Sequence, residues 1–116
     1  MNSDSVALVA AVTEPTRRRV LDLLLEHGES TPSELAHELP VTRQAISKHL
    51  IVLDRVGLVS GRRAGRQVHY QLNLDRLDEA ARSLGELAHA WDRRLARIKR
   101  LAEASHAAAR QQSESP

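Results

Sequence analysis

The sequence contains no cysteine, which excludes disulfide scaffolds, cysteine-based zinc sites and thiol nucleophiles. Aromatic residues make up only 2% of the chain, so almost no stacking surface is available for unpaired bases, and a single-strand nucleic-acid binder is disfavoured. No apolar run approaches the roughly 18 residues of a membrane-spanning helix, and the N-terminus lacks the basic start of a signal peptide. We therefore expect a cytoplasmic protein without a membrane partner.

The overall composition of the chain is typical of one globular domain rich in helices. The chain has 116 residues, of which 41% are hydrophobic and 28% are charged, enough for a single packed core. The sequence shows no nucleophile and base pair, no phosphate-binding glycine loop and no carboxylate dyad. We therefore do not expect an enzyme.

The charges are distributed unevenly along the chain, although the net charge is only +2. Residues 20–40 contain five acidic and no basic residues, whereas residues 41–70 contain six Arg or Lys residues against the single Asp54. Such clustering favours a polyanionic partner such as nucleic acid, and a solvated basic surface is the alternative.

Two helices joined by a short turn are predicted in the middle of the chain. Thr31-Pro32-Ser33-Glu34 has the pattern of a capping box with proline at the first helical position. Thr42 then caps a second helix, which Gly57 ends. An earlier helix begins at Thr13-Glu14-Pro15 and ends at Gly28. This arrangement is typical of a helix-turn-helix.

The hydrophobic spacing changes from helical to alternating after Gly57, which predicts a β-hairpin. Ala64-Gly65 lies between the two runs, and the glycine permits the positive φ of a two-residue loop. In the second run we expect one set of side chains to face the helices, Val68, Tyr70 and Leu72, and the alternating set to face outward, Gln67, His69 and Gln71.

The C-terminal third shows the most regular spacing in the sequence. Apolar residues recur at alternating intervals of four and three, the seam of helices that pair: Leu77, Ala81, Leu84, Ala88, Trp91, Leu95, Ile98 and Ala102. Gly85 lies inside this run, which leaves open whether it is one helix or two.

Together these elements predict a mainly α fold with a small β-hairpin. This is a winged helix-turn-helix with about five or six helices and a two-stranded wing. We expect residues 1–73 to form a DNA-binding domain, residues 74–109 to supply dimerisation helices that pack on it, and residues 110–116 to be frayed.

The second helix of a helix-turn-helix enters the major groove of double-stranded DNA, where its exposed N-terminal face reads base edges. Here that face presents Thr42, Arg43, Gln44, Ser47 and Lys48. His49 follows them, and it either donates to a phosphate or packs at the edge of the core. The hairpin would contact the backbone or the minor groove through a second set, Arg62, Arg63, Arg66 and Gln67.

Several motifs in register resemble a known family. The chain carries, in order, Pro15-Thr16-Arg17-Arg18-Arg19, Ser33-Glu34-Leu35-Ala36, Thr42-Arg43-Gln44-Ala45-Ile46-Ser47-Lys48-His49-Leu50, Val56-Gly57-Leu58-Val59 and Gly65-Arg66-Gln67-Val68-His69-Tyr70-Gln71-Leu72. Over about residues 6–75 this pattern resembles the ArsR/SmtB family of winged-helix repressors. Further on, Trp91-Asp92-Arg93-Arg94-Leu95 resembles the C-terminal part of a branch of that family without metal-binding motifs.

The resemblance implies a homodimer that binds an operator and blocks transcription. Its first and last helices would form the dimer interface, which here would include Val6, Leu8, Val9, Leu84, Ala88, Trp91, Leu95 and Ile98. Two-fold symmetry would make the operator an inverted repeat. The alternatives are a sensor of the same fold gated by an effector or by a metal held by His, Asp or Glu, and a protein-binding adaptor without DNA contact.

The residues that would bind metal in the family's metal sensors are replaced in this chain. Thr31 and Ser33 stand at one such site, and Leu74 and Arg76 stand at another, with partners expected near Leu87 and Ala90. None of these side chains matches a thiolate or imidazole ligand. The six histidines do not form a pair four residues apart on one helix. We therefore expect no metal site and no cofactor.

Overall fold

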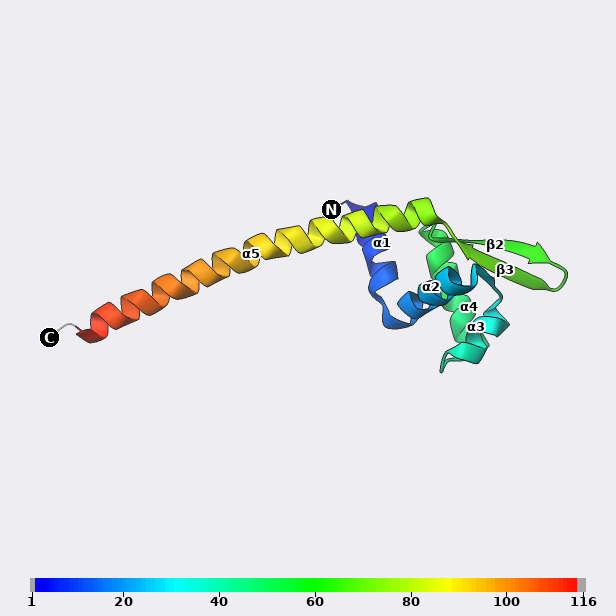
Figure 1. Cartoon of the computed structure of the whole chain (residues 1–116), viewed down its shortest axis with the longest axis horizontal. Coiled ribbons are helices and arrows are strands. Elements are labelled where there is room, and N and C mark those ends of the chain that lie inside the picture. The colour runs from blue at the N-terminus through cyan, green and yellow to red at the C-terminus, as the bar shows by residue number, and fades with distance from the viewer. Residues whose placement is uncertain (1, 115–116) are drawn as a thin grey trace. The chain divides into compact units, whose positions relative to one another are not determined.

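The computed structural model describes the backbone of residues 2–114 and the side chains of residues 2–112. The elements follow in the order α1 (Ser3–Thr13), α2 (Pro15–His27), β1 (Glu29–Ser30), α3 (Pro32–Glu38), α4 (Arg43–Arg55), β2 (Val59–Ala64), β3 (Gln67–Leu72) and α5 (Leu74–Glu114) (Figure 1). The predicted mainly α, winged helix-turn-helix fold is confirmed. Contacts divide the chain into two units, which meet in sequence between Ser83 and Leu84.

Side-chain caps explain where the helices of the N-terminal unit begin. The Glu14 carboxylate caps α2 by accepting a hydrogen bond from the Arg17 amide at 2.7 Å. The predicted capping box at the start of α3 is present: the Thr31 hydroxyl accepts from the Glu34 amide, and the Glu34 carboxylate accepts from the Thr31 amide, both at 3.2 Å. The Thr42 hydroxyl caps α4 in the same way. Polar residues at the predicted positions therefore fix the helix-turn-helix locally.

The core of this unit is formed by apolar faces of α1, α2, α3, α4 and the start of β2. Side chains less than 2% exposed include Leu8, Val20, Leu24, Leu35, Ile46, Leu50, Leu53 and Leu58. Ala80, in the second turn of α5, is also buried. The first turns of α5 therefore belong to the same packed unit as the helix-turn-helix.

Two residues predicted at the dimer interface are instead part of this core. Leu8 is 1% exposed and Val9 is 8% exposed within the single chain, so neither has appreciable surface left for a partner. Val6, on another face of α1, is 52% exposed. The apolar run at residues 6–12 is hydrophobic nearly all round, which is why the sequence did not separate its inner face from its outer one.

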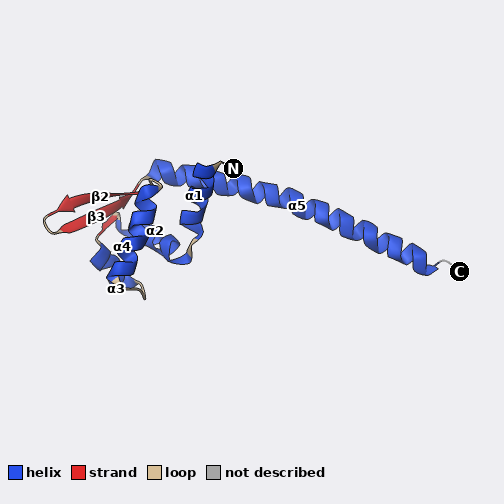
Figure 2. Ribbon diagram, turned by 180° about the vertical axis from the view of Figure 1, so that it is seen from behind, coloured by secondary structure: helices blue, strands red, loops and turns tan. Residues whose placement is uncertain are grey.

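The sheet has three strands instead of the predicted two. β1 adds to the hairpin in the order β1-β3-β2, with Glu29 opposite Gln71 and Ser30 opposite Tyr70. The two-residue loop is Gly65-Arg66, one position later than predicted, because Ala64 pairs with Gln67 and Gly65 takes the positive φ of 65°. A strand of two residues leaves no period in the sequence, and β1 was missed for that reason. Figure 2 shows the longer strands, β2 and β3, as an antiparallel ribbon.

The expected alternation of faces in β3 is confirmed, although one outward-facing residue is partly covered. Gln67 and Gln71 are exposed, while Val68, Tyr70 and Leu72 are half-buried. His69 lies on the face opposite Val68 and Tyr70, as predicted, but it is half-buried there because its Nδ1 atom lies 3.3 Å from Oε1 of Glu29 on the added strand β1.

α5 is a single helix that continues through Gly85, which answers the question of one helix or two. It also continues through residues 110–114, which were predicted to be frayed, while residues 115 and 116 lie outside the described chain. In the C-terminal unit several large apolar side chains are exposed, Trp91 by 49%, Leu95 and Ile98 by 56% each and Leu101 by 61%. Among the described residues, no helix is both long and apolar enough to span a bilayer.

Candidate nucleic-acid interface

The exposed face of α4 carries the side chains predicted to read DNA. Ile46, Leu50 and Leu53 are 0% exposed and fix the opposite face of the helix in the core. Because of that anchoring, the N-terminal part of α4 presents its polar side chains outward: Thr42, Arg43, Gln44 and Lys48 are exposed, and Ser47 is half-buried. These side chains offer the donors and acceptors that base edges in the major groove require.

One apolar residue extends this face and was missed from the sequence. Ile51 is 48% exposed and lies seven residues after Gln44 and three after Lys48, so the three share one side of α4. An exposed isoleucine on such a face can contact the methyl group of thymine. The helical spacing of these three residues was the signal that could have identified it.

A cavity of 190 Å³ lies between the helix-turn-helix and the hairpin. Its lining combines the start of α3, the start of α4 and the base of the loop: Thr31, Pro32, Ser33, Arg43, Ser47, Arg66, Gln67, Val68 and Tyr70. The fold thus brings together four predicted DNA-binding residues from separate parts of the chain, Arg43 and Ser47 with Arg66 and Gln67. Two guanidinium groups beside hydroxyl and amide groups suit a backbone phosphate.

The arginines of the hairpin do not share one face. Arg63 pairs with Val68 across the ladder, on the side of the hairpin that faces the cavity. Arg62 pairs with His69 on the other side, where its Nη2 atom lies 2.6 Å from Oε1 of Glu29. Within the described chain neither Arg63 nor Arg66 forms an ion pair. Among the hairpin arginines of the described chain, Arg63 and Arg66 are therefore without an ion pair, whereas Arg62 is paired with a carboxylate.

His49 packs against the junction of α1 and α2. Its Nδ1 atom lies 3.5 Å from Nη1 of Arg17 and 3.8 Å from Oε2 of Glu14, and its side chain is 23% exposed. The amide hydrogen bond from Arg17, with smaller contributions from Thr16 and His49, holds the pKa of Glu14 below its usual value. Of the two roles considered for His49, the geometry favours packing at the edge of the core.

The acidic residues gather on a different part of the N-terminal unit. A cavity of 500 Å³ is lined by residues from the end of α2, β1 and α3: His27, Glu29, Ser30, Glu34, His37 and Glu38. Its carboxylates repel a polyanion, so the uneven charge along the sequence becomes a charge difference between two surfaces. Among the residues that the structure describes, no three His, Asp or Glu side chains form a group suited to a metal ion.

Comparison with known proteins agrees with this geometry. A family model described as a helix-turn-helix domain matches residues 12–62. The HTH-type transcriptional regulator YuzN of Bacillus subtilis is 43% identical over 72 residues, which cover 57% of this chain and 78% of YuzN. The transcriptional repressor SdpR of the same organism is 34% identical over 70 residues, covering 60% of this chain and 77% of SdpR.

A solved structure extends the similarity into the C-terminal helix. The ArsR-like transcriptional regulator from Rhodococcus sp. RHA1 matches with a TM-score of 0.64 and 39% identity. The match covers 86% of this chain and 93% of the Rhodococcus chain.

Proposed function

The chain belongs to the ArsR/SmtB family of helix-turn-helix transcriptional regulators, and from this premise we propose that it is a homodimeric repressor of an inverted-repeat operator. In this proposal α4 reads base edges in the major groove through Arg43, Gln44, Ser47 and Lys48. The hairpin holds the DNA backbone through Arg63 and Arg66.

The cavity that joins α3, α4 and the hairpin is the observation that carries the proposal. Arg43 and Arg66 both line it, which supports a single phosphate held between them at the point where the recognition helix enters the groove. The hairpin contacts then fix the register in which the exposed face of α4 meets the bases. Repression follows from occupancy of a promoter, and the similarity to a relative named as a repressor supports it.

Exposed apolar side chains support the homodimer. Trp91, Leu95 and Ile98 occupy successive positions of the predicted seam, and each is about half exposed in the single chain. Leu101 adds to them and was not predicted. Covering each of these side chains would contribute roughly 1 kcal/mol or more, because the hydrophobic effect scales with the apolar area removed from water. A second copy with the same seam presents a matching surface.

The proposal is tested by selection of duplexes from a random library with the purified protein, followed by footprinting and sedimentation. We expect an enriched inverted repeat, protection of two half-sites, and a protein that sediments as a dimer. A single chain that shows no preference for the palindrome over a scrambled duplex would contradict the proposal.

A further inference from the structure

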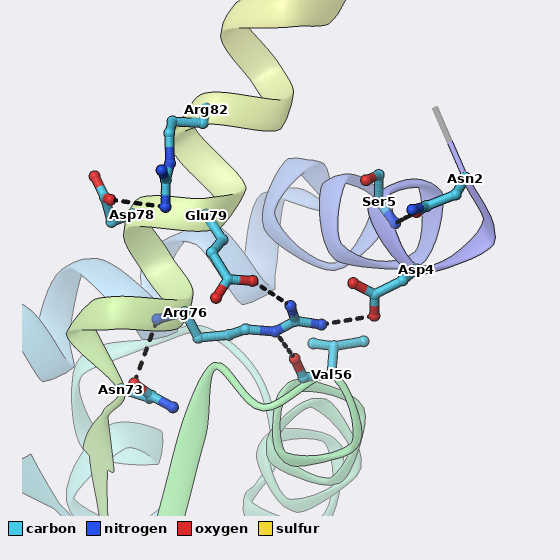
Figure 3. A network of polar contacts seen from close by, with 9 residues as sticks. All are labelled: Asn2, Asp4, Ser5, Val56, Asn73, Arg76, Asp78, Glu79 and Arg82. Atoms are coloured by element: carbon cyan, nitrogen blue, oxygen red, sulfur yellow. Dashed lines mark hydrogen bonds and ion pairs between the residues drawn. The ribbon is translucent and has the colours of Figure 1, made fainter.

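Arg76, which is not one of the predicted DNA-binding residues, joins three helices. Its Nε atom donates to the backbone oxygen of Val56 at 2.7 Å, its Nη2 atom lies 2.7 Å from Oδ1 of Asp4, and its Nη1 atom lies 2.6 Å from Oε2 of Glu79 (Figure 3). The Arg76 side chain is only 18% exposed. A planar guanidinium is the side-chain group that can satisfy three partners in such fixed directions.

The three partners belong to the ends of three different helices. Val56 is the C-terminal cap of α4, Asp4 lies in the first turn of α1, and Glu79 lies one turn after Arg76 on α5. The last carbonyls of a helix have no partner within the helix and carry partial negative charge. A cation that donates to the Val56 carbonyl therefore stabilises the end of α4 and fixes its position.

The surroundings leave α4 little freedom at this end. Gly57 follows with a φ of 80°, and a Cβ atom at Gly57 would lie 3.5 Å from Nε of Arg76, so the guanidinium packs directly over the turn. Hydrogen bonds from Arg76 hold the pKa of Asp4 below its usual value, and those to Asp4 and Glu79 raise the pKa of Arg76. Asp4 and Arg76 therefore both carry their charges at neutral pH.

We propose that Arg76 is a positioning residue for operator recognition, which ties the C-terminal end of α4 to α1 and to the first turns of α5. This inference rests on the proposed function, and it adds a residue that touches no base or phosphate in that proposal. Base readout requires that both recognition helices keep one fixed orientation relative to the DNA grooves. Contacts with the phosphate backbone tolerate small changes in that orientation. Loss of the tie should therefore lower affinity for the operator much more than affinity for random DNA.

The test compares R76Q with the wild-type chain by fluorescence anisotropy. The probes are the duplex enriched by the wild-type protein and a scrambled duplex of the same composition, each at several KCl concentrations. For R76Q we expect the operator Kd to rise roughly tenfold, in line with couplings carried by packed networks. The scrambled-duplex Kd and the salt dependence should not change, because no phosphate contact is removed.

Arg82 provides a matched control on the same helix. It also pairs with a carboxylate, Asp78 at 3.3 Å, but its side chain is 70% exposed and this ion pair stays within α5. We expect R82Q to bind both duplexes as the wild type does. Circular dichroism at the temperature of the binding assay establishes that both variants are folded.

A second variant removes only the contact with α1 and protects the test against misfolding of R76Q. D4N changes a residue that is 65% exposed, and we expect a smaller rise in operator Kd, about two- to threefold. Its control is D75N, which removes the acidic residue in the first turn of α5.

Equal losses of affinity for the operator and the scrambled duplex, or wild-type operator affinity in both R76Q and D4N, would overturn the inference. Failure of the wild-type protein to enrich any duplex would instead overturn the proposed function, and the inference with it.

Discussion

Removal of the Trp91 side chain should dissociate the proposed dimer while leaving the fold of the single chain intact. Trp91 is 49% exposed in the described chain, and an aromatic side chain covers about 150–250 Å² when it is fully buried. Covering its exposed half would therefore remove about 100 Å² from water. At about 25 cal/mol per Å² this contributes about 2.5 kcal/mol per protomer and about 5 kcal/mol per symmetric dimer.

An effect of this size is measurable by sedimentation equilibrium. Trp91→Ala should raise the dimer Kd roughly a few thousandfold, because every 1.4 kcal/mol is about a factor of ten. The matched control is Leu25→Ala, which truncates an apolar side chain of α2 that is 63% exposed and lies outside the predicted interface. The control should dimerise as the wild type does. A Trp91→Ala variant whose dimer Kd stays within a few fold of the wild-type value would refute the reasoning.

The remaining predictions concern DNA binding and the capping box. Arg43→Ala should cost about 1–3 kcal/mol at one base position and relax the sequence preference there, as checked with single-substitution operator duplexes. Arg63→Ala should weaken binding to all duplexes and reduce the salt slope by about one unit, whereas Arg62→Ala should change the slope less, since Arg62 is already paired with a carboxylate. Thr31→Ala should lower the free energy of unfolding by about 1 kcal/mol in urea titrations. The hydrogen bonds from Thr31 hold the pKa of Glu34 below its usual value. The ionised Glu34 carboxylate therefore contributes to stability at neutral pH, and this contribution is lost as the pH falls through the lowered pKa. At pH values below about 4, the urea midpoint of the wild type should decrease more steeply with pH than the midpoint of Glu34→Gln.

The order of the helices could be predicted because local chemistry defines it. Thr31 with Glu34, and Thr42, satisfy backbone amides within three residues, so their effect does not depend on the rest of the fold. The glycines at positions 28 and 57 take positive φ for the same local reason. The face of α4 that carries Arg43, Gln44 and Lys48 also followed from helical spacing alone.

Contacts between distant segments could not be predicted in the same way. β1 is too short to show a period, and it exists because β3 offers an open edge. It brings Glu29 to Arg62 and His69, which separates the arginines of the hairpin into a paired one and two unpaired ones. The contact between Arg76 and Asp4 spans 72 positions, and no local pattern points to it.

The sequence by itself determined where α2, α3 and α4 begin, the exposed face of the recognition helix and the uneven charge, because each depends on groups a few residues apart. The tertiary structure alone decided which apolar residues of α1 are buried, which arginine of the wing is neutralised and what holds the end of α4. Those outcomes depend on which surfaces meet when the core forms. Packing between distant segments decides this, and the local residue spacing of one segment does not indicate which other segment it will contact.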